Sequence, residues 1–213
     1  SVSHDLKAPL SSIQGLLNVA RLDKNNNASV YYDRIEKSVD KLDNFIKDII
    51  DFSKNSRLEL KQEKINVRDL VEEVKEGLSY LNEKNKIKWL DEIPADVTII
   101  SDKSRLIFIV NNLITNAIRY ADLTKKDPYV KITAKIEKGN FIFAVIDNGQ
   151  GIEKQYHKKI FDMFYRANTY STGSGLGLYI VKESVMKLGG EIEIQSELKL
   201  GTTITFTMSL QPK

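Results

Sequence analysis

The sequence predicts an α+β fold in two parts, a helical hairpin over residues 1–57 and an α/β sandwich over residues 58–213. In the first part apolar residues recur every three or four positions, which is typical of helices that pack along one stripe. The second part mixes helical patterns with short runs in which polar and apolar residues alternate, as in strands with one packed face. We therefore expect a mixed sheet covered by helices on one side.

The hairpin is expected to contain one helix over residues 1–22, a polar loop over 23–29 and a second helix over 30–56. The first helix carries its apolar stripe at heptad-like spacing, at Leu6, Leu10, Ile13, Leu17 and Ala20. The stripe of the second helix is too wide for one hairpin to cover, which favours pairing with a second copy of the chain. A hairpin that packs only onto its own domain is the alternative.

His4 lies roughly 160° around the first helix from the centre of the stripe, and is therefore expected to face solvent. An exposed histidine usually has no special role. An unprotonated imidazole is nevertheless a good nucleophile, and a neighbouring carboxylate can orient the ring or take its proton. Asp5 is the candidate for that carboxylate.

The second part is expected to contain helices over residues 68–84 and 103–120 and a third that begins near Leu178. Two of its strand pairs have hairpin signatures. The expected strands are 65–67, 86–90, 97–100, 129–136, 141–146, 191–194 and 202–208.

Two glycine clusters flank a flap over residues 153–172. The first, Asp147-Asn148-Gly149-Gln150-Gly151, follows a buried strand, and the second, Gly173-Ser174-Gly175-Leu176-Gly177, leads into a helix. Glycines let the backbone approach a ligand closely, and a helix N-terminus attracts anions. Taken alone, the first cluster could be a turn and the second a linker. Together they predict a nucleotide pocket with one carboxylate and an anion cradle.

A third motif lies on the helix over residues 103–120, where Asn112, Asn116 and Tyr120 are four residues apart and share one face. An amide oxygen is a suitable ligand for Mg²⁺, Arg119 offers a charge for phosphate, and Tyr120 offers a ring for a base. The alternative is a simple solvated face.

These motifs, in this order, resemble those of sensor histidine kinases over nearly the whole chain. The resembling boxes are an H box (His4-Asp5-Leu6-Lys7-Ala8-Pro9), an N box (Asn112 to Tyr120), a G1 box (Asp147 to Gly151), an F box (Ile160 to Arg166) and a G2 box (Gly173 to Leu178). The resemblance implies a dimeric four-helix bundle followed by an ATP-binding domain of the GHKL type. It also implies that ATP and Mg²⁺ are cofactors, and that a response-regulator receiver domain is a partner.

The same resemblance implies a role for each candidate residue. His4 takes the γ-phosphoryl group of ATP, Asp147 hydrogen-bonds the adenine amino group, and Asn116 holds Mg²⁺. The remaining ATP-binding candidates are Asn112, Arg119, Tyr120, Gly149, Gly151, Arg166, Gly173, Gly175 and Gly177. Ala8 stands where the family often has Thr or Asn, so we expect weak phosphatase activity.

Two other functions have to be weighed against a kinase. A nucleotide-dependent ATPase of the same fold, as in type II topoisomerases or mismatch-repair proteins, needs no phosphoryl acceptor, and the H box argues against it. An ATP-binding or inactive signalling scaffold is disfavoured by the intact Asn116, Asp147 and glycine clusters.

Composition excludes several further classes. The net charge is only +3, from 32 basic and 29 acidic residues without a basic block, so we expect no nucleic-acid partner. No cysteine is present, which excludes disulfides and thiol chemistry. No apolar run approaches the roughly 20 residues of a membrane helix, so we expect no membrane contact. We expect the cytoplasmic piece of a longer protein, in which membrane anchors or sensor modules remain open alternatives.

Overall fold

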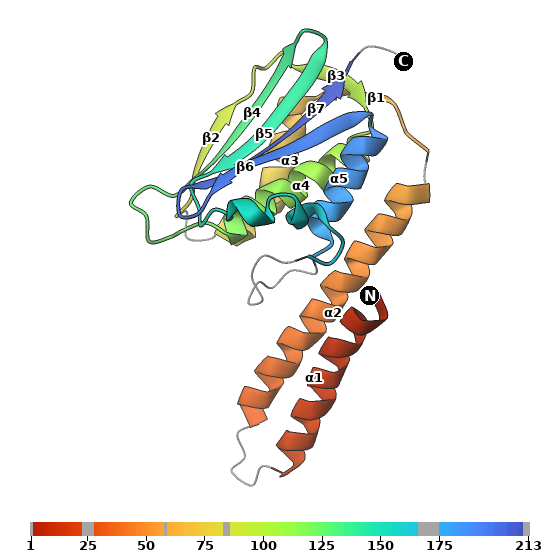
Figure 1. Cartoon of the computed structure of the whole chain (residues 1–213), viewed down its shortest axis with the longest axis vertical. Coiled ribbons are helices and arrows are strands. Elements are labelled where there is room, and N and C mark those ends of the chain that lie inside the picture. Colours follow the sequence, from red (N-terminus) through yellow and green to blue (C-terminus); the bar gives the residue numbers. More distant parts are fainter. Residues whose placement is uncertain (1, 23–27, 58, 83–85, 166–174, 211–213) are drawn as a thin grey trace. The chain divides into compact units, whose positions relative to one another are not determined.

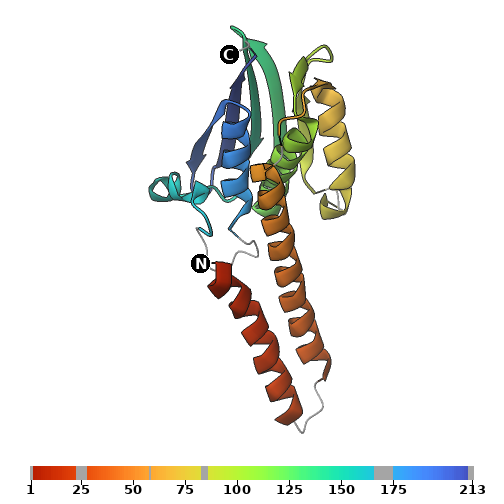
Figure 2. The same cartoon turned by 90° about the vertical axis from the view of Figure 1, so that its right-hand side faces the viewer.

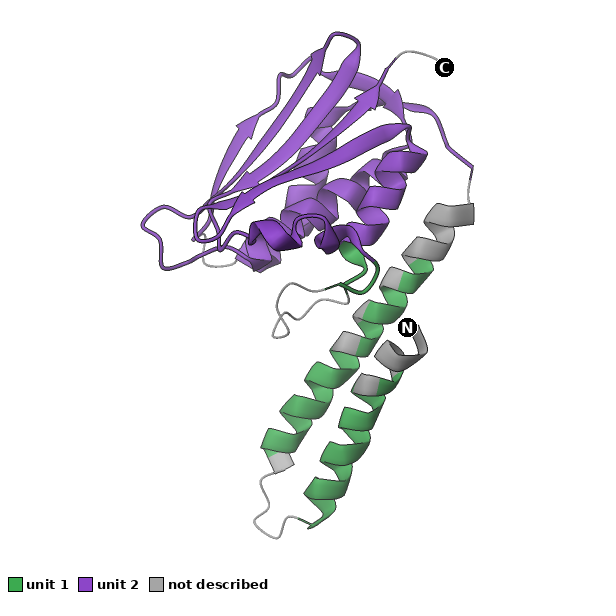
Figure 3. Cartoon of the chain, in the orientation of Figure 1, with its two compact units in different colours: residues 1–57, 163–177 green, residues 58–162, 178–213 purple. Residues whose placement is uncertain are grey.

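The computed structural model describes residues 2–22, 28–57, 59–82, 86–165 and 175–210, and within the first two helices only part of the side chains. The chain divides into two compact units (Figure 3). Unit 1 is Ser1–Arg57 with Met163–Gly177, and unit 2 is Leu58–Asp162 with Leu178–Lys213. Each unit is described by itself.

Unit 1 is built on the helices α1 (Val2–Leu22) and α2 (Ala28–Arg57), which contact one another as a hairpin. Phe45 of α2 is buried, and its ring stacks on that of Phe164 with centroids 6.0 Å apart. The apolar stripes expected on the two helices are only partly covered. The residues of these stripes that stay exposed are Leu10 (49%), Leu17 (42%), Val39 (48%) and Ile46 (43%).

Unit 2 contains a five-stranded mixed sheet in the order β2-β4-β5-β7-β6, which confirms the predicted architecture. The strands are β2 (Lys88–Glu92), β4 (Tyr129–Glu137), β5 (Asn140–Asp147), β6 (Gly190–Glu197) and β7 (Gly201–Ser209). Strands β2 and β4 are parallel, and the other neighbours are antiparallel. The helices α3 (Val67–Gly77), α4 (Lys103–Arg119) and α5 (Gly177–Lys187) lie on one face of this sheet (Figures 1 and 2).

Two details differ from the sequence-based expectation or extend it. The helix predicted over 68–84 ends at Gly77 and continues only as a 3₁₀ turn, Ser79–Asn82, because glycine weakens a helix by about 1 kcal/mol. Strands β1 (Glu63–Asn66) and β3 (Thr98–Ser101) pair with each other in a separate two-stranded sheet.

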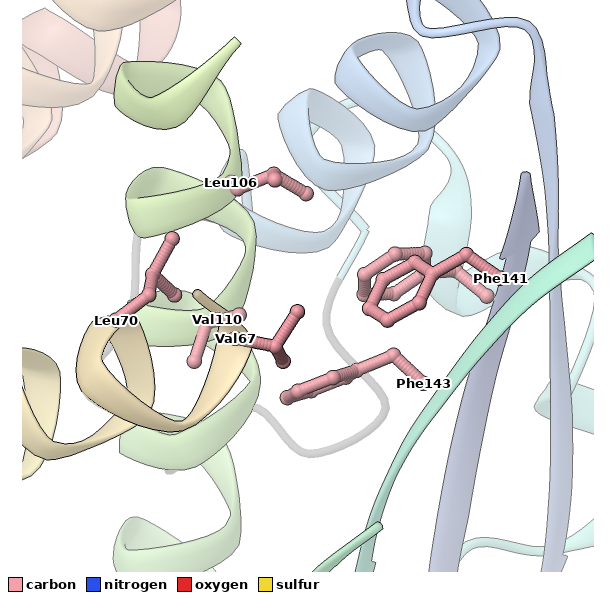
Figure 4. Close-up of a pocket in the computed structure, with 7 residues that line it drawn as sticks. Val67, Leu70, Leu106, Val110, Phe141 and Phe143 are labelled. Atoms are coloured by element: carbon pink, nitrogen blue, oxygen red, sulfur yellow. The ribbon is translucent and has the colours of Figure 1, made fainter. Parts of the chain in front are cut away.

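The core between sheet and helices is aromatic and aliphatic. The rings of Phe143 and Phe206 stack with centroids 5.2 Å apart, and the ring of Phe141 lies edge-on to Phe206 at 5.9 Å. A small apolar cavity remains between α3, α4 and these rings (Figure 4). It is lined by Val67, Leu70, Leu106, Val110, Phe141, Phe143 and Phe206. None of the predicted site residues lines this cavity, so we interpret it as a packing gap in the core.

The start of α4 is fixed by a buried carboxylate. Asp102 caps the helix by accepting a hydrogen bond from the backbone N–H of Arg105 (3.0 Å). Its second oxygen accepts from the backbone N–H of Lys61 (3.0 Å) and pairs with the buried guanidinium of Arg105. Burial raises the pKa of Asp102, but the two N–H groups and the Arg105 charge outweigh it and hold that pKa below its usual value.

Candidate functional site

The first predicted site residue, Asp147, is the last residue of β5 and is largely buried. One of its carboxylate oxygens accepts a hydrogen bond from the backbone N–H of Gly149 at 2.8 Å. Burial raises the pKa of Asp147 to about 6, against the hydrogen bonds from the backbone N–H groups of Gly149 and Thr202 and the nearby charge of Lys125. Since the protein itself does not fully compensate this carboxylate, Asp147 retains the capacity to bind a hydrogen-bond donor from a ligand.

Backbone atoms surround this carboxylate so closely that side chains are excluded. A Cβ added at Gly149 would lie 2.3 Å from the carbonyl oxygen of Tyr120, and one at Gly151 would lie 1.9 Å from that of Glu197. Gly151 also has a φ of +67°, which favours glycine. The Tyr120 carbonyl further accepts the N–H of Gln150 at 3.0 Å. The structure therefore brings together Tyr120 from the N box and Gly149 and Gly151 from the G1 box.

The turn between β6 and β7, residues 197–201, is a part of the site that sequence reasoning missed. A Cβ added at Gly201 would lie 2.0 Å from the carbonyl oxygen of Asp147. The N–H of Lys199 donates to the carbonyl of Gln150 at 2.6 Å. The turn thus packs against the G1 box through backbone contacts. The only local signal was Gly201 itself, which reads as an ordinary turn glycine.

A second missed feature is the loop over residues 121–128, between α4 and β4. The side chain of Asn148 donates to the carbonyl of Asp127 (2.8 Å) and accepts from the N–H of Tyr129 (2.8 Å). One asparagine of the G1 box therefore fixes the end of this loop. Asn148 belongs to the first glycine cluster, and nothing in the sequence indicated which segment it would contact.

The amide face predicted on α4 is present in unit 2. Asn112 donates a hydrogen bond from its amide to the carbonyl of Phe108 (3.0 Å), which is in its own helix. Asn116 is half-buried, and no group in the described part of the chain hydrogen-bonds its side chain. Arg119 is exposed and ends the helix, and Tyr120 is 37% exposed. Amide oxygens of this kind fit Mg²⁺, which takes few protein ligands beside water and phosphate.

The other predicted residues lie in unit 1, and for several of them the position or the side chain is outside the described part of the chain. Gly175 and Gly177 belong to unit 1. Gly175 has a φ of +74°, and its carbonyl accepts the N–H of Phe164 at 3.0 Å, whereas Gly177 begins α5. Arg166 and Gly173 lie outside the described residues. His4 and Asp5 are part of α1, and their side chains lie outside the described part.

Two features typical of other kinds of site are absent from the described residues. Within the described ranges, no three His, Cys, Asp or Glu side chains gather as ligands for a metal ion. No helix among these residues combines the length and the apolar character needed to cross a membrane.

Comparison with known families yields two matches that together cover most of the chain. Residues 101–212 match the family described as "Histidine kinase-, DNA gyrase B-, and HSP90-like ATPase". Residues 1–57 match the "His Kinase A (phospho-acceptor) domain". The first match covers more than half of the chain and includes the N, G1 and G2 boxes.

Individual relatives are similar over the full chain. The methanogenesis regulatory histidine kinase FilI of Methanothrix harundinacea is 30% identical over 98% of this chain, which spans 24% of that protein. The chain therefore spans about a quarter of this curated relative. In fold it resembles the Acinetobacter baumannii histidine kinase AdeS (TM-score 0.78, 23% identity, 98% of both chains). It also resembles the histidine kinase ThkA, solved in complex with response regulator protein TrrA (TM-score 0.77, 24% identity, 99% of this chain and 60% of that one).

Proposed function

Because this chain belongs to the histidine kinase-, DNA gyrase B- and HSP90-like ATPase family and carries a His Kinase A phospho-acceptor domain, we propose that it is the core of a two-component sensor histidine kinase. Residues 1–57 form the dimerisation and phosphoacceptor domain, and residues 58–213 form the ATP-binding catalytic domain. The γ-phosphoryl group of Mg·ATP passes to His4 and then to an aspartate of a response-regulator receiver domain. The reaction takes place in the cytoplasm.

The observation that carries this proposal is the largely buried Asp147 in its glycine cradle. A carboxylate accepts hydrogen bonds only, so it suits the exocyclic amino group of adenine. A guanine carbonyl at the same position would place two acceptors together and leave both without a donor, which disfavours GTP. Gly149 and Gly151 have no side chain that could obstruct a base, and Tyr120, the residue that follows α4, is adjacent to Gly149 through its backbone carbonyl.

The phosphate end is assigned to the polar face of α4 and to the second glycine cluster. The residues proposed to contact the phosphates are Asn112 and Arg119 of the N box, Arg166 of the F box, and Gly173, Gly175 and Gly177 of the G2 box. Asn116 would hold Mg²⁺, which would supply the charge neutralisation that phosphoryl transfer requires. The half-buried amide of Asn116 supports this assignment, because it has no hydrogen-bond partner among the described residues.

The transfer step is a displacement at the γ-phosphorus. A nitrogen of the His4 imidazole attacks the γ-phosphorus and forms an N–P bond, while the bond to the oxygen that bridges to the β-phosphate breaks. ADP leaves with that electron pair, and the proton on the other ring nitrogen moves to Asp5. Ala8 provides neither a hydroxyl nor an amide to orient water, so the phosphatase activity of the domain toward its partner protein is weak. An Ala8→Thr variant without any gain in phosphatase activity would count against this explanation.

The hairpin provides the support for a homodimer. Leu10 and Leu17 on α1 and Val39 and Ile46 on α2 are 42–49% exposed in a single chain. Fully burying an exposed leucine-sized side chain is worth about 2 kcal/mol, so covering these half-exposed side chains contributes about 1 kcal/mol each to association. A second copy of the hairpin offers the same apolar stripe, and the product is a four-helix bundle.

The proposed function is tested with γ-labelled Mg·ATP. We expect the protein to take up label that is labile in acid and stable in base, and His4→Gln to abolish it. His157→Gln is the matched control, because His157 is the second of only two histidines and its ring nitrogen contacts the carbonyl of Ile152 at 3.0 Å. Retained label in His4→Gln would refute His4 as acceptor. ATP hydrolysis without any label would instead favour the ATPase, and ATP binding with neither would favour the scaffold.

A further inference from the structure

The loop over residues 121–128 inserts one lysine between two turns of the candidate site. The Nζ atom of Lys125 lies 2.5 Å from the carbonyl oxygen of Asn148 and 2.7 Å from that of Lys199. The carbonyl oxygens of Gly149 and Leu200 lie at 3.3 and 3.4 Å. The ammonium group therefore connects the G1 box to the β6–β7 turn, two segments separated by some fifty residues of sequence.

An ammonium group is well suited to this position. It has three donors and no acceptor, and its compact charge can serve several carbonyl oxygens that converge from different directions. Four carbonyl oxygens that converge without a cation would repel one another. Lys125 is half-buried, whereas the next residue, Lys126, is exposed and makes no contact of this kind with the described residues.

The loop is itself folded in a way that presents Lys125. The carboxylate of Asp122 accepts hydrogen bonds from the backbone N–H (3.0 Å) and the hydroxyl (2.6 Å) of Thr124. The N–H of Lys125 donates to the carbonyl of Asp122 at 3.2 Å, which closes a tight turn. Since the backbone on both sides of Lys125 is fixed, its side chain loses less conformational freedom when it binds the two turns.

The two connected turns are the ones that determine the environment of Asp147. Gly149 donates its N–H to the Asp147 carboxylate, and Gly201 abuts the Asp147 carbonyl. If the turns separate, the carboxylate loses both its orientation and part of its burial. Lys125 is also the one charged side chain in the described chain whose field lowers the pKa of Asp147; the other groups that lower it are the backbone N–H groups of Gly149 and Thr202.

We propose that Lys125 is a positioning residue for the adenine end of the nucleotide site, which acts by tying the G1 box to the β6–β7 turn. The inference rests on the proposed function, because it takes Asp147 as the residue that binds adenine. Lys125 does not touch the nucleotide and acts through the two turns.

The test compares Lys125→Met with Lys126→Met by isothermal titration of Mg·ATP and Mg·ADP at several pH values. Methionine keeps the length of the side chain and removes its charge and donors. We expect Lys125→Met to bind both nucleotides about tenfold more weakly, since several hydrogen bonds from a charged group are lost. The loss should be equal for ATP and ADP because the effect is at the base, and Lys126→Met should bind like the wild type.

The pH profile separates positioning from general destabilisation. Nucleotide binding requires the ionised carboxylate, so it should weaken as the pH falls through about 6. In Lys125→Met this midpoint should move to higher pH, and in Lys126→Met it should not. A purely structural role would lower the melting temperature and the fraction of active protein, and would leave the midpoint in place.

Each outcome decides one question. A wild-type protein that binds no ATP would refute the proposed function. A wild-type protein that binds ATP, with a Lys125→Met variant of equal affinity and equal midpoint, would refute only the inference about Lys125. If Lys125→Met does not fold by circular dichroism, Lys125→Arg is measured instead. It keeps the charge but not the compact geometry, so weaker binding by a folded variant with a wild-type melting temperature supports the inference, and wild-type affinity overturns it.

Discussion

Two carboxylates of unit 2, the buried Asp102 and the half-buried Asp147, have pKa values that their surroundings shift in opposite directions. Asp102, at the start of α4, has two backbone N–H donors and the guanidinium of Arg105, and its pKa lies below the usual value although burial alone would raise it. Asp147, at the end of β5, also has two backbone N–H donors, but burial dominates and its pKa is raised to about 6. Asp147 is the more strongly desolvated of the two, and no cation among the described residues contacts it as Arg105 contacts Asp102.

The comparison separates a carboxylate that stabilises the fold from one that is available to a ligand. The protein satisfies Asp102 internally, so it joins the segment around Lys61 to α4 and has little left to offer a ligand. Asp147 costs folding free energy when it is ionised, and a ligand that donates a hydrogen bond recovers part of that cost. An under-compensated carboxylate beside a glycine cradle is therefore a better indication of a binding site than burial alone.

The largest expected effect comes from removing the satisfied carboxylate. Asp102→Ala deletes the helix cap and the charge that neutralises the buried Arg105 guanidinium, so we expect the free energy of unfolding to fall by about 3–5 kcal/mol. Urea denaturation followed by circular dichroism measures it. Asp127→Ala is the control, because its ion pair with Lys88 is exposed and little change is expected. Equal losses of unfolding free energy in the two variants would contradict the special role of Asp102 in the fold.

A glycine pair tests whether the backbone around Asp147 is as crowded as the structure indicates. Gly151 and Gly189 have similar φ angles, +67° and +75°, but only Gly151 would place a Cβ against another segment. Gly189→Ala should cost about 1 kcal/mol for the backbone conformation. Gly151→Ala should cost at least about 2 kcal/mol more, since the turn at Glu197 must move, and it should also weaken ATP binding. Similar stability of the two variants would contradict the close contact.

Asp147→Asn should change the free energy of unfolding in the opposite direction to Asp102→Ala. It removes a carboxylate whose ionisation is unfavourable in the folded state, so we expect the nucleotide-free protein to gain about 1–3 kcal/mol near neutral pH. The same change should weaken ATP binding roughly 10- to 100-fold, because a charge-assisted hydrogen bond is lost. Calorimetry measures the binding, and denaturation measures the stability. A variant that loses both stability and binding would show that Asp147 is structural.

The smallest expected effect is the pH dependence of that gain. The folded-state pKa of Asp147 lies above its ordinary value of 3.8, so its contribution to stability is complete below about pH 4 and is lost as the pH rises through about 6. The stability difference between Asp147→Asn and the wild type should therefore shrink by roughly half between pH 7.5 and pH 5. Denaturation of both proteins at each pH measures it, and the subtraction cancels the other carboxylates. A difference that does not change with pH would contradict the raised pKa.

The sequence predicted the elements well because their periodicities are strong. The helix over 103–120 was expected from its apolar stripe and is present as Lys103–Arg119, and the strands expected over 129–136 and 141–146 are present as β4 and β5. Glycine limited this success at Gly77, where a stripe continues beyond the end of the helix. The register of β5 with β7 and the separate β1–β3 sheet depend on long-range pairing, which no local pattern encodes.

For the site, the sequence indicated the groups that belong to recognisable motifs and missed those that act through the backbone. Asp147 and Gly149 were found because a carboxylate and glycines follow a strand. Lys125 was not found, because a lysine in a polar loop is usually solvated and its function depends on where two distant turns meet. The sequence also could not show that Asp147 has a higher pKa than Asp102, since the pKa of each depends on burial and on partners remote in sequence.

The close contact of Gly201 with Asp147 has a consequence for the timing of synthesis. Strand β7 lies inside the sheet, between β5 and β6, yet it is the last of the five strands to leave the ribosome. Translation proceeds at some 5–20 residues per second, so β5 and its carboxylate wait several seconds for the turn that supports them. Until then β5 is an open sheet edge, and the G1 box lacks the backbone contacts of the β6–β7 turn. The candidate nucleotide site is thus complete only after β7 has inserted between β5 and β6.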